Sequence, residues 1–175
     1  SPHLFSGTII DNIRYGNNSI SDEEVIASAK LVNAHNFIMK LENGYYTEVG
    51  EGGAMLSTGE KQLISFARAI ISKPKLFVLD EATSSIDTET EALIQDAIHK
   101  VLEGRTSFVI AHRLSTIRNA DKILVIKKGV VVESGNHHEL LEKKGYYYKL
   151  YMKQFVEEKE SEIFGRNYED ILVNS

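Results

Sequence analysis

A short apolar run that ends in two adjacent carboxylates is the most constraining segment of this chain. Residues 76 to 81 read Leu-Phe-Val-Leu-Asp-Glu, between Lys75 and a turn-like Ala-Thr-Ser-Ser. Such a run predicts a strand buried on both faces of a parallel sheet, with the two acids at its carboxyl end. Acids at such a position need a cation, and Mg²⁺ that a nucleotide carries in is the usual one. We expect Asp80 to hold this metal and Glu81 to polarise an attacking water, although a pair of turn-capping acids explains the run alone equally well.

Two further motifs flank this run along the chain. Residues 56 to 62, upstream of it, read Leu-Ser-Thr-Gly-Glu-Lys-Gln, and Ala111-His112-Arg113 follows a second strand-like run at 107 to 110. In this order the three segments resemble the signature sequence, the Walker B strand and the switch histidine of the ATP-binding cassette family. Residues 84 to 87, Ser-Ser-Ile-Asp, stand where that family has its D-loop. The combination is highly specific, and the resemblance extends from residue 1 to about residue 156.

The resemblance implies a role for each of these residues. Asp80 would bind the Mg²⁺ of a bound ATP, Glu81 would be the catalytic base, and His112 would contact the γ-phosphate and steady the attacking water. Asp87 would contact the phosphate loop of a partner domain, although a place at a helix N-terminus explains this residue as well. The signature residues would bind the γ-phosphate of an ATP held by the opposite subunit, and they are Ser57, Thr58, Gly59 and Glu60.

The signature residues also predict the start of a helix. Ser57 and Glu60 follow the Ser-x-x-Glu pattern of a capping box, and the N-terminus of such a helix offers unpaired N–H groups to an anion. The family usually has Gly where Thr58 stands and Gln where Glu60 stands, so this chain places an additional negative charge near the phosphate. An ordinary capped helix without a ligand is the alternative interpretation.

Two other segments indicate which branch of the family the chain resembles. Residues 1 to 16 are similar to the segment that follows the Q-loop glutamine in exporters, and residues 47 to 52 are similar to the exporter loop that touches the transmembrane coupling helices. The implied partners are a second nucleotide-binding domain and the transmembrane domains, at the cytoplasmic face of the membrane. One alternative is a chromosome-maintenance or repair ATPase, against which the lack of heptads between residues 1 and 57 argues. The other alternative is a non-catalytic binding module.

One motif of the family is missing from the sequence. Nowhere does it read G-x-x-x-x-G-K-[S/T], the loop that holds the β- and γ-phosphates and that lies upstream of the Q-loop in the family. We therefore expect the chain to be the carboxyl-terminal part of a nucleotide-binding domain. Alone, it should be inactive as an ATPase and bind Mg-ATP weakly or not at all.

The composition excludes several other classes of protein. The 175 residues carry a formal net charge of -5, which provides no general basic surface for nucleic acid. The sequence has no cysteine, so disulfides and thiolate metal sites are excluded. Its apolar runs are far shorter than the ~20 residues that a membrane-spanning helix needs.

Capping patterns and apolar spacing predict a mixture of helices and strands. The resemblance implies an α/β fold, with the helical subdomain of an ABC ATPase and an incomplete P-loop NTPase-like parallel sheet. We expect the helical subdomain at residues 1–74, the catalytic-core part at 75–156 and a charged tail at 157–175. A hairpin should join 123–126 to 130–132. Helices are expected at about 22–41, 58–73, 89–103, 116–119 and 139–155.

Overall fold

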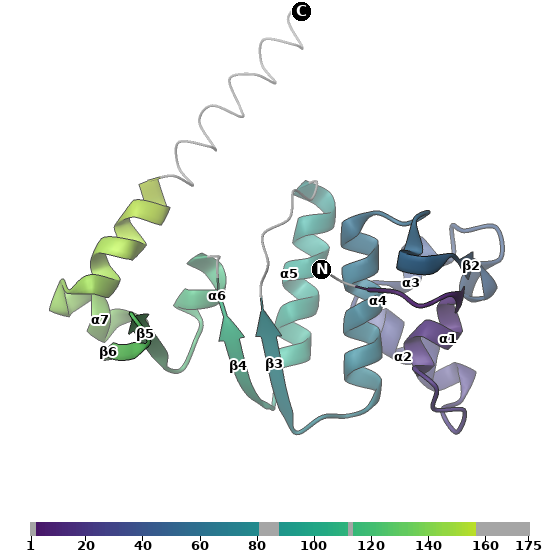
Figure 1. The fold of residues 1–175 in the computed structure, drawn as a ribbon, viewed down its shortest axis with the longest axis horizontal. Helices are drawn as coiled ribbons and strands as arrows, with labels where there is room; N and C mark the ends of the chain where they lie inside the picture. The colour runs from purple at the N-terminus through teal and green to yellow at the C-terminus, as the bar shows by residue number, and fades with distance from the viewer. Residues whose placement is uncertain (1–2, 81–87, 112–113, 157–175) are drawn as a thin grey trace, which may run out of the picture. The chain divides into compact units, whose positions relative to one another are not determined.

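The computed structural model describes residues 3–80, 88–111 and 114–156 (Figure 1). It divides the chain into two units, Ser1–Val109 and Ile110–Ser175, each of which is considered by itself. The first strand of the expected catalytic-core part therefore lies in the same unit as the expected helical subdomain. The functional division of the chain at residues 74 and 75 remains a prediction.

The first unit contains helices and two small two-stranded sheets. This mixture of helices with a small parallel sheet confirms the predicted α/β class. The elements in chain order are β1 (Gly7–Thr8), α1 (Ile9–Arg14), α2 (Asp22–Leu31), α3 (His35–Ile38), η1 (Gly44–Tyr46), β2 (Glu48–Val49), η2 (Glu51–Gly53), α4 (Thr58–Ile71), β3 (Leu76–Asp80), α5 (Thr88–Leu102) and β4 (Thr106–Ile110).

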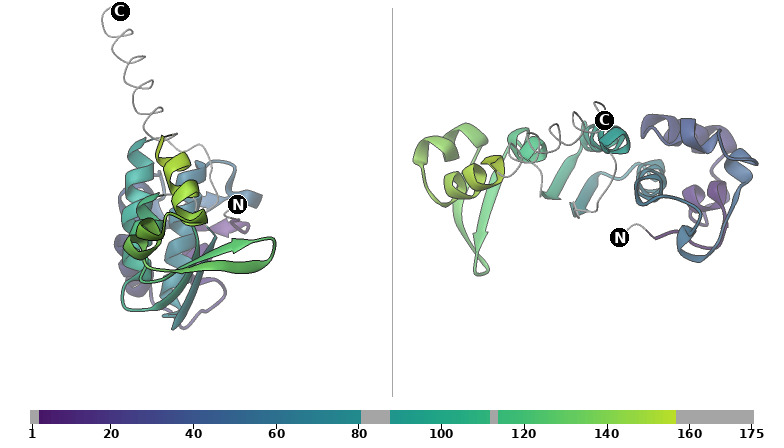
Figure 2. Two further views of the ribbon diagram at one scale, coloured as in Figure 1. Left: turned by 90° about the vertical axis from the view of Figure 1, so that its left-hand side faces the viewer. Right: turned by 90° about the horizontal axis from the view of Figure 1, so that it is seen from above.

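Helix α4 is the centre of the first unit and packs against α1, α2 and α5 (Figures 1 and 2). Its apolar side chains recur at helical spacing, and each large one contributes about 1.5 to 3 kcal/mol of transfer free energy on burial. The helix stops where expected, because Lys73 adopts a left-handed conformation with φ of 50° and Pro74 follows. The buried residues of α4 are Gly59, Leu63, Ile64, Phe66, Ala67 and Ile70.

Strands β3 and β4 pair and run in the same direction (Figure 1). Phe77 and Leu79 of β3 are buried in the core that α4 and α5 share, whereas Val78 on the opposite face is 66% exposed. On β4, Phe108 is 59% exposed. The prediction that the run at 76–79 is buried on both faces is therefore wrong for this structure. Side chains alternate across a strand, and among the described residues only one face of this pair is covered.

The predicted helix over 22–41 is interrupted after α2, which is a correction of the sequence-based expectation. Asn33 has a φ of 63°, and α3 begins only at His35. The Asn33 side chain donates to the carbonyl of Leu93 at 3.1 Å and to the Asp96 carboxylate at 2.7 Å, both on α5. This contact joins residues that are 60 positions apart, and the local pattern does not reveal it.

Strands β1 and β2 join the two segments that resemble exporter sequences. They pair antiparallel, with Gly7 opposite Val49 and Thr8 opposite Glu48. Nearby, the N–H of Gly52 donates to the carbonyl of Leu4 at 3.1 Å. Gly52 and Gly53 adopt positive φ of 70° and 64°, and a Cβ added at Gly53 would lie 2.9 Å from the Leu4 side chain.

The second unit contains the predicted hairpin, followed by helices (Figure 2). Strands β5 (Ile123–Lys127) and β6 (Val130–Gly135) pair antiparallel with an irregularity after Val125. Lys128 and Gly129 both have positive φ, as a tight two-residue hairpin turn requires. The remaining described elements are α6 (Leu114–Arg118), α7 (His137–Lys143) and a helix over 146–156.

The predicted single helix from 139 to 155 is in fact two helices. Lys144 is left-handed with a φ of 48° and ends α7. The Glu133 carboxylate then accepts from the N–H groups of Tyr146 at 2.6 Å and Tyr147 at 2.8 Å, and so caps the next helix. These bonds lower the pKa of Glu133 below its usual range. The predicted tail at 157–175 lies outside the described residues, and none of the described helices combines the length and apolar character needed to cross a membrane.

The exposed face of β3 and β4 leads to a prediction about the chain when it is expressed alone. We expect it to form dimers or larger species at micromolar concentration, because exposed apolar strands pair and pack with other copies. Val78→Lys should shift the mass measured by light scattering toward that of a monomer. Leu31→Lys, which changes an exposed residue at the end of α2, should not. A monodisperse monomer without either substitution would contradict this expectation.

Candidate functional site

The signature segment forms the N-terminus of α4, as its capping pattern predicts. Ser57 is the N-cap residue, and its hydroxyl accepts from the N–H of Glu60 at 3.2 Å. The Glu60 carboxylate in turn accepts from the N–H of Ser57 at 2.8 Å. The capping box therefore uses the N–H groups of Ser57 and Glu60. Those of Thr58 and Gly59, in the first turn, have no acceptor within the helix and suit an external anion.

The Glu60 side chain places a negative charge at the positive end of α4. A carboxylate there is stabilised by the helix dipole, and a bound phosphate would be stabilised by the same field. Ser57 and Thr58 are exposed, while Gly59 is buried. An anion at this helix end would thus approach the Ser57 hydroxyl with the Glu60 carboxylate as a like-charged neighbour.

Among the site residues predicted after the signature segment, Asp80 is the one that the structure describes. It is the last residue of β3 and is exposed. Because the chain descends along α4 and returns along β3, the N-terminus of α4 and the carboxyl end of β3 lie on the same side of the unit (Figure 1). Glu81, Asp87 and His112 lie outside the described residues.

The Asp80 carboxylate at the end of β3 suits a magnesium ion. In nucleotide sites Mg²⁺ commonly takes one or two protein carboxylates and completes its shell with phosphates and water. Asp80 offers one exposed carboxylate of that kind. Among the described residues, no group of three or more His, Cys, Asp or Glu side chains could bind a metal by itself. The residues present thus fit a metal that arrives with a nucleotide.

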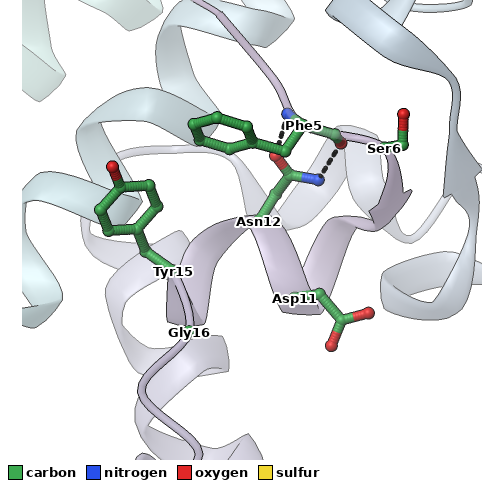
Figure 3. Close-up of a pocket in the computed structure, with 6 residues that line it drawn as sticks. All are labelled: Phe5, Ser6, Asp11, Asn12, Tyr15 and Gly16. Carbon is green, nitrogen blue, oxygen red and sulfur yellow. Dashed lines mark hydrogen bonds between the residues drawn. The ribbon is translucent and has the colours of Figure 1, made fainter.

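A hollow of about 340 Å³ lies beside α1 (Figure 3). Two exposed aromatic residues border it, with Phe5 45% and Tyr15 63% exposed. The buried Asn12 amide fixes its floor, because it accepts from the N–H of Phe5 at 2.9 Å and donates to the carbonyl of the same residue at 2.8 Å. The residues that line the hollow are Phe5, Ser6, Asp11, Asn12, Tyr15 and Gly16.

The hollow was not predicted from the sequence. Residues 1 to 16 resemble an exporter segment, but this resemblance does not predict a surface. The pairing of β1 with β2 shows that this segment is continuous with the loop at 47–52. Two aromatic residues ten positions apart, Phe5 and Tyr15, are the signal that could have indicated a contact surface.

Comparisons with known proteins relate the sequence of this chain to a family. A family model described as "ABC transporter" matches residues 2–84. The chain is 52% identical over 164 residues to an ATP-dependent lipid A-core flippase of Syntrophus aciditrophicus, an alignment that covers 94% of this chain and 27% of the flippase.

Two further relatives come from a bacterium and an amoeba. The uncharacterized ABC transporter ATP-binding protein YfiC of Bacillus subtilis is 55% identical, over 87% of this chain and 25% of that protein. Multidrug resistance protein 1 of Entamoeba histolytica is 53% identical, over 88% of this chain and 12% of that protein. The chain thus spans about a quarter or less of the length of these relatives.

The capping box of α4 predicts a measurable loss of stability. Ser57→Ala should lower the free energy of unfolding by about 1 kcal/mol, because the N–H of Glu60 loses its acceptor. Ser21→Ala is a matched control, since Ser21 and Glu24 form the same capping box on α2 at 3.1 and 3.3 Å. Urea unfolding of dilute chain should give similar losses for both variants. A loss at Ser21 without one at Ser57 would show that the α4 box is unimportant for folding.

Proposed function

Because the chain belongs to the ABC transporter family, we propose that it contributes residues to ATP sites that power a membrane exporter. The observation that supports this proposal is the α4 N-terminus, where the Ser57 hydroxyl and the first-turn N–H groups offer hydrogen-bond donors on the same side of the unit as the end of β3. The names of the relatives, a lipid flippase and a multidrug resistance protein, support an exporter over a chromosome-maintenance or repair ATPase. The sequence contains no phosphate loop, so we infer that the chain alone does not hydrolyse ATP.

In this proposal the strand end after β3 is the catalytic half of one ATP site. Asp80 would hold Mg²⁺, which neutralises charge on the β- and γ-phosphates when it is bound. Glu81 would accept a proton from the attacking water, and His112 would contact the γ-phosphate and orient that water. Asp87 would contact the phosphate loop of a partner domain.

The α4 N-terminus would be the other half of a second ATP site, whose phosphate loop belongs to a partner nucleotide-binding domain. The Ser57 hydroxyl can donate to a γ-phosphate while its oxygen still accepts from the N–H of Glu60. The N–H groups of Thr58 and Gly59 would complete the anion site. Such a site closes only when two domains meet, so ATP would hold the dimer together.

We also propose that the transmembrane domains contact the surface formed by residues 47–52 and the Phe5–Tyr15 hollow. The pairing of Gly7 with Val49 brings the backbones of these two segments together. Exposed aromatic rings beside a hollow suit an apolar helix or turn from a partner. This contact would place the chain at the cytoplasmic face of a membrane.

Replacing Glu81 with Gln in the full-length transporter should slow ATP hydrolysis by roughly 10² to 10⁴-fold, because the amide cannot accept the proton of the water. ATP binding should persist, and the ATP-bound dimer should become long-lived. Phosphate release and size-exclusion chromatography measure these two effects. Hydrolysis within about threefold of the natural protein would remove Glu81 from the role of base.

The Glu60 carboxylate should weaken the binding of ATP between domains. Two like charges about 6 Å apart at an effective dielectric constant of 40 to 80 repel by about 0.7 to 1.4 kcal/mol. Glu60→Gln in the full-length protein should therefore lower the ATP concentration for half-maximal dimerisation about three- to tenfold.

Glu24→Gln is the matched control for this substitution, because Glu24 has the same place in the capping box of α2. It should leave the ATP dependence of dimerisation unchanged. If Glu60→Gln instead raised the ATP requirement, Glu60 itself would contact the nucleotide.

A further inference from the structure

Arg68 connects α4 to both aromatic residues of the hollow. Its guanidinium carbon lies 5.2 Å from the ring centroid of Phe5 and 5.4 Å from that of Tyr15. The two ring centroids are themselves 5.5 Å apart. The three groups therefore form a triangle in which each contacts the other two, and the position of either ring depends on the guanidinium.

Three hydrogen bonds fix the Arg68 guanidinium in this place. Nε donates to the carbonyl of Asn12 at 2.8 Å, and Nη2 donates to its Oδ1 at 2.8 Å. Nη1 donates to the carbonyl of His3 at 2.9 Å. The guanidinium thus ties the N-terminal segment and α1 to α4 at the same time. A lysine ammonium lacks the planar fork needed to reach all three acceptors and to lie against two rings.

Tyr15 borders two hollows. One is the 340 Å³ hollow beside Phe5. The other has a volume of about 410 Å³, and Tyr15 lines it together with Arg68, Ile20, Ala69 and other residues. Burial lowers the pKa of the Arg68 guanidinium, although arginine stays charged at neutral pH. The hydrogen bonds and ring contacts compensate the partial loss of water around this charge.

Arg68 is 11 residues beyond Ser57 on the same helix, which corresponds to about 16 Å along the axis. One rigid element therefore carries the proposed anion site at its N-terminus and the contact to the aromatic rings near its other end. A displacement of α4 when a nucleotide binds would move Phe5 and Tyr15 through the guanidinium.

We propose that Arg68 is the positioning residue of the transmembrane contact surface, which holds Phe5 and Tyr15 in place and makes them follow α4. This inference rests on the proposed contact between that surface and the transmembrane domains. Arg68 acts through the two rings, so its effect on coupling should disappear when a ring is removed.

The experiment uses the full-length transporter in lipid vesicles, with ATP and vanadate as the probe. The first readout is the change that ATP and vanadate cause in the rate of tryptic cleavage of the transmembrane domains. The second is the KM for ATP in hydrolysis, and the third is the melting temperature. Arg68→Lys keeps the charge and the tryptic site but removes the planar fork.

We expect Arg68→Lys and Tyr15→Leu each to reduce the ATP-induced change in the rate of tryptic cleavage at least fourfold. The KM for ATP should stay within about twofold of the natural value. The double variant should be no worse than the more affected single variant. Arg105→Lys is the control, because Arg105 also donates to two backbone carbonyls, those of Val101 and Glu103, without either ring. It should leave all three readouts unchanged.

Several results would overturn the inference. If the fold losses of the two single variants multiply in the double variant, Arg68 acts independently of Tyr15. A parallel fall in melting temperature and rise in KM would leave Arg68 a purely structural residue. If Arg68→Lys folds poorly, Phe5→Leu tests the same claim with the three hydrogen bonds of Arg68 intact, and no loss of coupling in it would overturn the inference.

The effects of Tyr15→Leu and Arg68→Lys distinguish a failure of this inference from a failure of the proposed contact surface. No effect of Tyr15→Leu would remove the proposed contact at the hollow, and the role of Arg68 with it. A strong effect of Tyr15→Leu together with none of Arg68→Lys would remove the Arg68 inference alone.

Discussion

The burial of the apolar face of α4 is the interaction on which the rest of the first unit depends. Leu63, Ile64 and Ala67 are almost fully buried and lie in one core with residues of α1, α2, α5 and β3. Loss of such packing costs several kcal/mol per large side chain, which is a substantial part of the stability of a domain. Because this face is fixed, both ends of α4 have defined positions relative to their neighbours.

The two ends of α4 use that fixed position differently. At the N-terminus, the capping box of Ser57 and Glu60 determines where the helix starts and which N–H groups face outward. Toward the other end, Arg68 leaves the core face and holds Phe5 and Tyr15 through its guanidinium. In our proposal, a single helix thus connects an anion site to a surface that contacts a protein partner.

Features that depend on a few neighbouring residues were predictable. The capping boxes at Ser21 and Ser57 and the hairpin turn at Lys128 and Gly129 are formed as the sequence indicates. The two helix breaks were not predicted. Each occurs at a left-handed residue, Asn33 or Lys144, and lies beside a contact with a distant partner. Asn33 is bound by α5, and the helix over 146–156 is capped by Glu133 of β6. The prediction that both faces of the strand at 76–79 are buried was wrong. An apolar run shows that both faces of a strand are apolar, but it does not show which element covers each face.

The sequence alone indicated the family through its resemblance in motif order, and it determined the capping boxes, because caps depend on short-range geometry. The residues that carry the chemistry are a proposal from that resemblance. Only the tertiary structure decided that β1 pairs with β2 and that Arg68 meets Phe5 and Tyr15. Arg68 is 56 positions from Asn12 along the chain. A contact of that separation exists only after the apolar face of α4 has packed against α1, so neither periodicity nor a local motif can reveal it.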